Sequence, residues 1–141
     1  MSTTLENDIA AILARKVLAA PSVTDLIGDR IYPEALPQKC PLPAIAFSLE
    51  SEESESTLSG AAGIANARVQ FTCMAYDAVD AKALKDRVRE TLHGKAFQQD
   101  GFDILECQHE NTQGLLFAKP DGSDAGTYTV QTDFFCIYTE G

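Results

Sequence analysis

Two long stretches of alternating side chains constrain this chain more than any other feature. In the range 64–76, small or apolar residues take every second position and mostly polar residues take the positions between them. The range 127–139 has a similar alternation, with Tyr128, Phe134 and Tyr138 in one set and Phe135 and Ile137 in the other. Successive side chains of a strand point to opposite faces, so this period of two predicts two long strands. Each is expected to bury at least one face.

The helical stretches are marked by a different period. Residues 77–93 place apolar side chains at helical spacing, after Asp77 as N-cap and before Gly94 as C′ residue. A second helix is expected over residues 3–20, because Thr3 and Glu6 match a capping box. Its predicted apolar face is Leu5, Ile9, Ile12, Leu13 and Val17. Pro21 should end it, with one further turn capped by Ser22.

The remaining segments complete the expected order of elements. Residues 42–50 and 102–110 read as two further strands, and prolines make residues 30–43 a stiff extended segment. Residues 51–63 and 112–126 are expected to be long loops, the first of them acidic and rich in serine. We expect one domain spanning residues 1–141.

This order, α-β-β-α-β-β, predicts an α+β fold. The expected architecture is a four-stranded mixed sheet with two helices packed on one face. Two helices cover one face of such a sheet, so apolar residues of the other face are left over. An uncovered apolar face indicates a partner.

Charge limits the classes of partner. The chain has 21 acidic and 11 basic residues, a net charge of −10. Binding to a nucleic-acid backbone depends on Lys and Arg, so a nucleic-acid binder is not expected. No apolar run is long enough to span a membrane, and the N-terminus lacks the basic residues of a signal peptide. We expect a chain made in the cytosol, with its four cysteines reduced.

The sequence offers little catalytic chemistry. Cys107 and His109 point to one face of the same strand, but side chains two apart are about 7 Å from each other, too far for a good dyad. Zinc would need two further ligands at a usual spacing. The acidic run at Glu50, Glu52, Glu53 and Glu55 fits a solvated segment or the lining of a ring. We expect no enzyme, no metal site and no cofactor, and keep a small Cys107/His109 enzyme as the least favoured alternative.

Six segments of the chain, taken in order, resemble a known family. The pattern is LIGDRIYP at 26–33, LPQKCPLPAIAF at 36–47, LSG at 58–60, ARVQFTCMA at 67–75, DAVDAKALKDRVRETLHG at 77–94 and GTYTVQTDFFCIY at 126–138. In this order the segments resemble the tail completion, or tail terminator-like, proteins of long-tailed bacteriophages and prophages. The resemblance covers nearly the whole chain.

The resemblance implies a virion protein at the head-proximal end of the tail. Such a protein forms a ring, usually hexameric, that caps the tail tube, ends tube polymerisation and presents the surface to which the head docks. The implied partners are further copies of the chain, the tail tube protein and head–tail connector proteins, with DNA passing through unbound. A head-closure or connector adaptor protein is the alternative. Our hypothetical interface residues are Arg30, Tyr32, Pro33, Leu58, Arg68, Leu115, Leu116 and Phe117, and our hypothetical lumen-facing acids are Glu52, Glu53 and Glu55.

Overall fold

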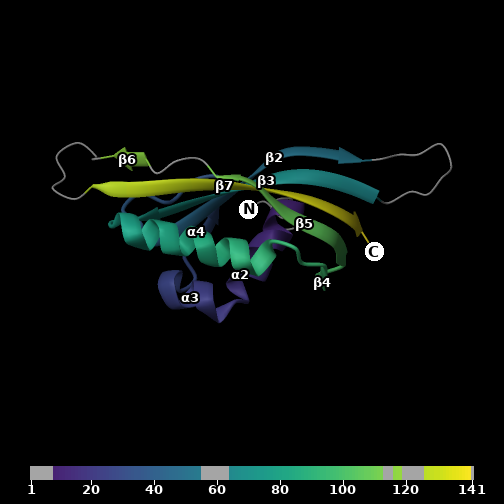
Figure 1. Ribbon diagram of the computed structural model, residues 1–141, viewed down its shortest axis with the longest axis horizontal. Coiled ribbons are helices and arrows are strands. Elements are labelled where there is room, and N and C mark those ends of the chain that lie inside the picture. Colours follow the sequence, from purple (N-terminus) through teal and green to yellow (C-terminus); the bar gives the residue numbers. More distant parts are fainter. Residues whose placement is uncertain (1–7, 55–63, 113–115, 119–125, 141) are drawn as a thin grey trace.

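The structure is a computed structural model that describes residues 8–54, 64–112, 116–118 and 126–140. In these residues it has one curved sheet with a layer of helices against one face (Figure 1). The path of the sheet is β1-β2-β3-β7-β5-β4, and β6 also pairs with β7. The α+β class and the helices on one face are therefore confirmed. The prediction of four strands and two helices is wrong, since the described residues form seven strands and three helices.

The four predicted strands are the long strands of this sheet. They are β2 (Ala44–Ser54), β3 (Ile64–Ala75), β5 (Phe102–Thr112) and β7 (Thr127–Glu140). β7 lies in the middle, antiparallel to both β3 and β5. The chain's last strand therefore joins its two halves.

Three strands of three residues each were missed by the sequence analysis. They are β1 (Ile31–Pro33), β4 (Phe97–Gln99) and β6 (Leu116–Ala118). None is long enough to show a period of two, and each is held by the backbone of a longer neighbour. β1 pairs in parallel with β2 within the proline-rich segment, and β6 pairs with β7 inside the predicted 112–126 loop.

The end of β2 is a further correction. We expected a loop from Ser51, but β2 continues to Ser54 and pairs with β3 as far as Ser54↔Ala65. A bulge between Leu49 and Ser51 shifts the register. The long alternating strand β3 supplies a template that overrides the weak strand preference of the Ser- and Glu-rich sequence.

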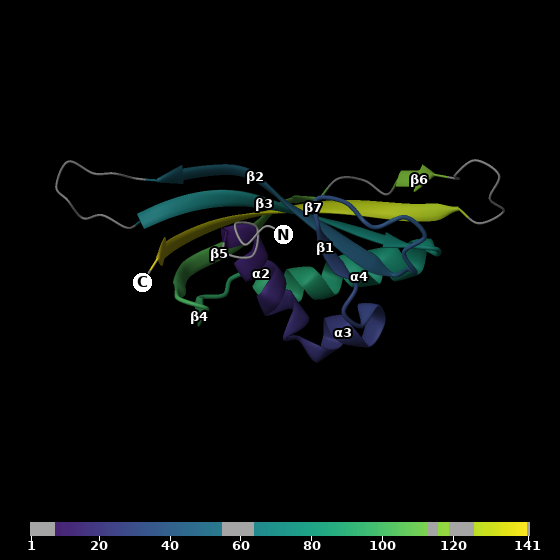
Figure 2. The ribbon, with the colours of Figure 1, turned by 180° about the vertical axis from the view of Figure 1, so that it is seen from behind.

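The helices lie together beneath the sheet (Figure 2). α4 (Ala78–Leu92) begins as expected, because the Asp77 carboxylate accepts a hydrogen bond from the Val79 N–H at 2.8 Å. α2 (Ile9–Leu18) begins later than expected, at the N-cap Asp8, which accepts from the Ala11 N–H at 2.9 Å. Thr3 and Glu6 of the predicted capping box lie outside the described residues.

The third helix replaces the single turn that we expected. α3 (Pro21–Ile27) has Ala20 rather than Ser22 as its N-cap, and Pro21 opens it instead of only ending α2. The fixed φ of proline suits the first turn, where its missing N–H has no partner to lose. Gly28 follows with φ +62°, a conformation that glycine adopts without the steric cost of a Cβ atom.

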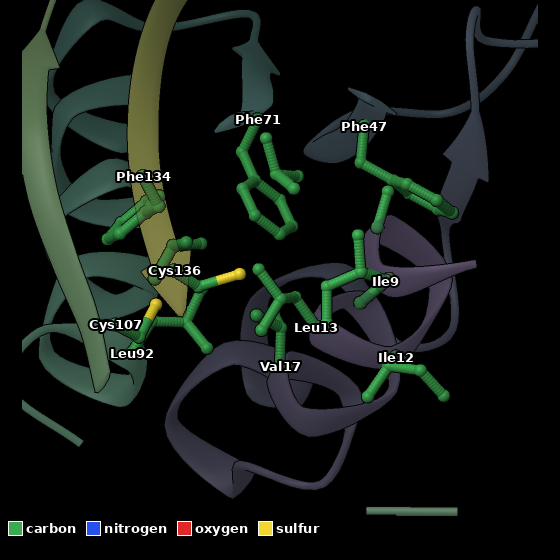
Figure 3. Packing of buried hydrophobic residues seen from close by; sticks show 14 of the residues in the cluster. Ile9, Ile12, Leu13, Val17, Phe47, Phe71, Leu92, Cys107, Phe134 and Cys136 are labelled. Atoms are coloured by element: carbon green, nitrogen blue, oxygen red, sulfur yellow. The ribbon is translucent and has the colours of Figure 1, made fainter. Parts of the chain in front are cut away.

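The core fills the space between the helices and the sheet (Figure 3). Phe71 of β3 and Phe134 of β7 meet edge to face with ring centroids 5.8 Å apart, and Leu13 and Val17 of α2 are fully buried with them. The predicted inward stripe of α4 is also fully buried: Ala81, Leu84, Val88 and Leu92. One face of the sheet is thus buried in the core.

Candidate assembly surface

The helix-free face of the sheet is the first candidate surface. Strand alternation assigns its residues, because Asn66 pairs with Ile137 and Arg68 with Phe135, while their neighbours Ala67 and Val69 are buried. Phe135 and Ile137 are half-buried on this face, whereas Phe134 and Tyr138 point into the core. The expectation that one aromatic set is left outside the helix layer is confirmed.

Arg68 sits near the centre of this face and is held by an ion pair. Its Nε and Nη2 donate to the two carboxylate oxygens of Glu110 at 2.6 and 3.1 Å. The hydrogen bond from Arg68 lowers the pKa of Glu110, and the same bond raises the pKa of Arg68. Next to it, the Gln70 amide donates to Asp133 at 3.1 Å. The pairs order side chains across β3, β5 and β7.

Carboxylates outnumber cations on the helix-free face. Pairing and hydrogen bonds place one basic residue there, Arg68, among the residues described. The acidic residues of the same face are Glu50, Glu53, Asp103, Glu106, Glu110 and Asp133. By contrast, most of the basic residues lie in the helix layer or just after it, namely Arg15, Lys16, Lys82, Lys85, Arg87, Arg89 and Lys95. The described part of the helix-free face is therefore strongly acidic, whereas the helix layer mixes its cations with acids such as Asp80, Asp86 and Glu90.

The hypothetical lumen acids fall on both sides of the sheet. Glu53 pairs with Asn66 and belongs to the helix-free face, whereas Glu52 pairs with Ala67 and belongs to the helix-covered side. Glu52 accepts a hydrogen bond there from the hydroxyl of Tyr138. Glu55 lies outside the described residues. Because consecutive residues of a strand point to opposite faces, Glu52 and Glu53 cannot both line the same surface.

One end of the sheet gathers exposed apolar side chains. Phe117 of β6 is 56% exposed and packs on Tyr128 of β7 with centroids 4.7 Å apart. Leu116 is 57% exposed beside it. Tyr76 and Val79, at the junction of β3 and α4, are exposed at the same end. Of the hypothetical interface residues, Leu116 and Phe117 are thus at the surface, while Leu58 and Leu115 lie outside the described residues.

The proline-rich segment is bound to its own subunit. Ile45 N–H donates to Arg30 O at 3.0 Å and Glu34 N–H donates to Phe47 O at 2.8 Å, which attaches β1 to β2. The Arg30 guanidinium donates to the carbonyls of Pro43 and Leu26 at 3.0 and 3.3 Å. The proline-rich segment therefore packs on the sheet edge of its own subunit.

Tyr32 and Pro33 form the outward part of the same segment. Pro33 is exposed and Tyr32 is half-buried, where burial and then the neighbouring Cys40 raise the pKa of its hydroxyl. Arg30 has a structural role within the subunit, whereas these two residues stay available at the surface beside it.

Cys107 and His109 do not form a catalytic pair. Cys107 is fully buried against Cys136, its partner across β5 and β7, and burial raises the pKa of its thiol far above the ordinary range. His109 instead places Nε2 2.6 Å from the Thr112 hydroxyl, and its ring packs on Phe134. A protonated, buried thiol is a poor nucleophile, so this constellation is part of the core.

Comparison with known proteins gives the family. The family model described as tail completion protein gp17 matches residues 10–138. The chain belongs to this family. A solved structure titled "Virion of native gene transfer agent (GTA) particle" contains a similar fold, with a TM-score of 0.66 and 19% sequence identity over 98% of this chain and 99% of that chain. The search of curated proteins found no match.

As a member of the tail completion family, the chain is a structural component of a phage tail. Concavities of about 460 and 280 Å³ lie near the β4–β5 turn and between the ends of α2 and α4, and neither is lined by Cys107 or His109. No described helix is long and apolar enough to cross a membrane. In the same residues no three His, Cys, Asp or Glu side chains gather as a metal site would require.

Proposed function

We propose that this tail completion protein forms a homo-oligomeric ring, hexameric as the resemblance implies, at the head-proximal end of the tail. The ring caps the tail tube, ends polymerisation of the tube protein and offers the surface to which head–tail connector proteins join. The observation that carries the proposal is the exposure of the sheet: helices cover one of its faces, and the opposite face, which is acidic, is left open. Together with the family, this arrangement supports a subunit whose second face belongs to an assembly.

The helix-free face is the surface that we assign to the lumen. Among the described residues, six carboxylates and one cation, Arg68, which is already paired with Glu110, make this face repel a phosphate backbone. DNA therefore slides past without release of condensed counterions, which is the main source of non-specific affinity. The half-buried Phe135 and Ile137 place apolar surface between the charged side chains.

Neighbouring residues of β2 give a matched test of this assignment. Glu53→Lys changes a charge on the helix-free face, and Glu52→Lys makes the same change on the helix-covered side. We expect assembled Glu53→Lys particles to eject DNA more slowly, or to bind DNA fragments in pull-down at low salt, and assembled Glu52→Lys particles to eject and bind DNA as the parent does. Equal effects of the two changes, or none with Glu53→Lys, would contradict the lumen assignment.

Deletion of the gene tests the function as a whole. Electron microscopy of lysates should show tubes of abnormal length, or tails of normal length that do not join heads. Full heads that leak DNA beside complete tails would transfer the role to a head-closure or connector adaptor protein. Normal infectious particles would refute a structural role at this junction.

A further inference from the structure

The edges of the sheet differ in how well they are protected. An unpaired strand edge exposes N–H and C=O groups that another strand can bind, and proteins usually block such edges. β1 contains Pro33, which has no N–H to donate. Neither β1 nor β4 has an exposed large apolar side chain, whereas β6, which is equally short, exposes Leu116 and Phe117.

The edge of β5 is blocked by the helix layer and by bulges. Gly94 N–H donates to Cys107 O at 2.7 Å, and His109 N–H donates to Nδ1 of His93 at 2.9 Å. The exit of α4 thereby occupies the groups that a neighbouring strand would need. Register shifts on either side, between Ile104 and Glu106 and between His109 and Asn111, interrupt the rest of this edge.

Two further edges lack a partner strand among the described residues. β1 leaves β2 after Phe47, so beyond the bulge at Glu50 the range 51–54 is regular strand with β3 on one side and no described partner on the other. β6 has β7 on one side and an open edge on the other. These edges lie on opposite borders of the sheet and at opposite ends of its long axis (Figure 1).

We propose that the open edge of β2, residues 51–54, pairs with the open edge of β6, Leu116–Ala118, of a second copy of this chain. The proposal rests on the ring proposed above and names the contact that closes it. β6 runs antiparallel to β7, as β3 does, so β6 is antiparallel to β2. Rotation about a ring axis keeps the component of each strand direction along that axis, so strands that run mainly along the axis meet antiparallel and continue the sheet from copy to copy.

Charge selects β6 rather than a second β2 as the partner. Pairing two β2 edges would set Glu52 and Glu53 of one copy against those of the other, and like charges across a strand pair are destabilising. The residues of β6 are uncharged, and Leu116 and Phe117 are more than half exposed. A contact between two different edges is head-to-tail, which is the kind that builds rings.

The displacement of the two edges also fits a closed ring. Because they lie at opposite ends of the sheet, joining them shifts each copy along the strand direction relative to the last. Closed barrels require such a stagger, which tilts their strands against the axis. Edges at the same level would instead give untilted strands.

Cross-linking tests the contact in assembled tails. Ser51 pairs with Arg68 and Leu116 with Thr129, so both lie on the helix-free face and both are exposed. In a Cys40→Ser background, particles carrying both Ser51→Cys and Leu116→Cys are treated with a bis-maleimide of about 10 Å reach, enough for a register slip of two residues. We expect covalent ladders of the chain. The control pair, Ser51→Cys with Lys82→Cys on the exposed side of α4, should give none.

Each outcome bears on one proposal. Ladders with Ser51→Cys alone would replace the head-to-tail contact by paired β2 edges. An oligomer in the tails without Ser51–Leu116 cross-links would overturn the edge pairing and leave the ring intact. A chain that is monomeric in, or absent from, the tails would overturn the ring itself and with it the contact.

A charge pair gives an independent readout. Leu116→Lys and Leu116→Glu lose the same apolar side chain but set opposite charges against the acidic β2 edge. We expect Leu116→Glu to need about fivefold more protein for half assembly than Leu116→Lys, from the usual range for one cross-strand charge pair. Equal assembly of the two variants would contradict the proposal even if both fold less stably than the parent.

Discussion

Replacement of Phe71 by alanine should be the most damaging single truncation in the sheet. Phe71 is fully buried on β3 and its ring contacts Phe134 edge to face at 5.8 Å and Phe47 at 6.4 Å. Removal of a buried phenyl ring costs about 3–5 kcal/mol in unfolding free energy. In a domain of this size each kcal/mol lowers Tm by roughly 4 °C, so the expected shift is roughly 12–20 °C.

Thermal and urea unfolding of Phe71→Ala, Phe134→Ala and the double variant separates the loss of each ring from the loss of the contact between them. Phe71→Ala with Phe134→Ala should show a coupling of about 1 kcal/mol, the usual value for an aromatic pair. Phe117→Ala is the control, since this ring is 56% exposed and should cost about 1 kcal/mol or less. A Tm shift for Phe71→Ala no larger than that of the control would refute the assignment of the core to the helix-covered face.

Further predictions concern single groups. Burial lowers the pKa of His109, so stability should be complete above the ordinary imidazole pKa of about 6.5 and decline as pH falls through the lower folded value; His109→Gln should flatten this dependence in urea titrations. Thiol titration of the folded chain should detect Cys40 readily and Cys107 only after unfolding. Cys107→Ala should cost roughly 1–2 kcal/mol by calorimetry and leave particle assembly intact. Asp77→Ala should lower the unfolding free energy by about 1 kcal/mol through loss of the α4 cap.

The alternation of the strands and the helical spacing were enough to predict most of the core residues. The buried residues of β3 and the inward stripe of α4 follow directly from the sequence, because a long period leaves few ways to bury its apolar side. The same reasoning divided β7 into its two faces but left open which of them is buried; in the structure Phe134 is buried and Phe135 is half-buried. It did not give the position of β7 between β3 and β5, which depends on contacts between distant parts of the chain.

The short strands could not be predicted because their cause lies outside their own residues. β1 exists because Arg30 and Glu34 bond to the backbone of β2, and three residues containing Pro33 carry no signal of their own. β2 continues through Ser51–Ser54 because β3 is there to pair with it. In each of these cases tertiary pairing overrides local preference.

The candidate surface was only partly visible in the sequence for the same reason. Exposed Leu116 and Phe117 were selected within an expected loop, but that they form a strand edge depends on Thr127–Thr129 of β7. Glu52 and Glu53 were grouped as neighbours in a loop, and a strand sends them to opposite faces. The partner of Arg68, Glu110, is 42 residues away, and no local pattern joins them.

The acidic helix-free face bears on how copies with a net charge of −10 can meet at all. Such a charge repels other copies, yet screening confines the repulsion of exposed groups to about 8–10 Å at physiological salt. In the proposed ring the acidic faces lie opposite one another across a hydrated channel that is wider than this screening length. The contacts between copies fall at the uncharged β6 edge, where one side carries no carboxylate to repel the acids of β2. A ring with its sheet outside would set the helix layers, where most of the described cations lie, around the path of the DNA. Repulsion between copies and passage of DNA thus favour the same orientation, with the helix-free face inward.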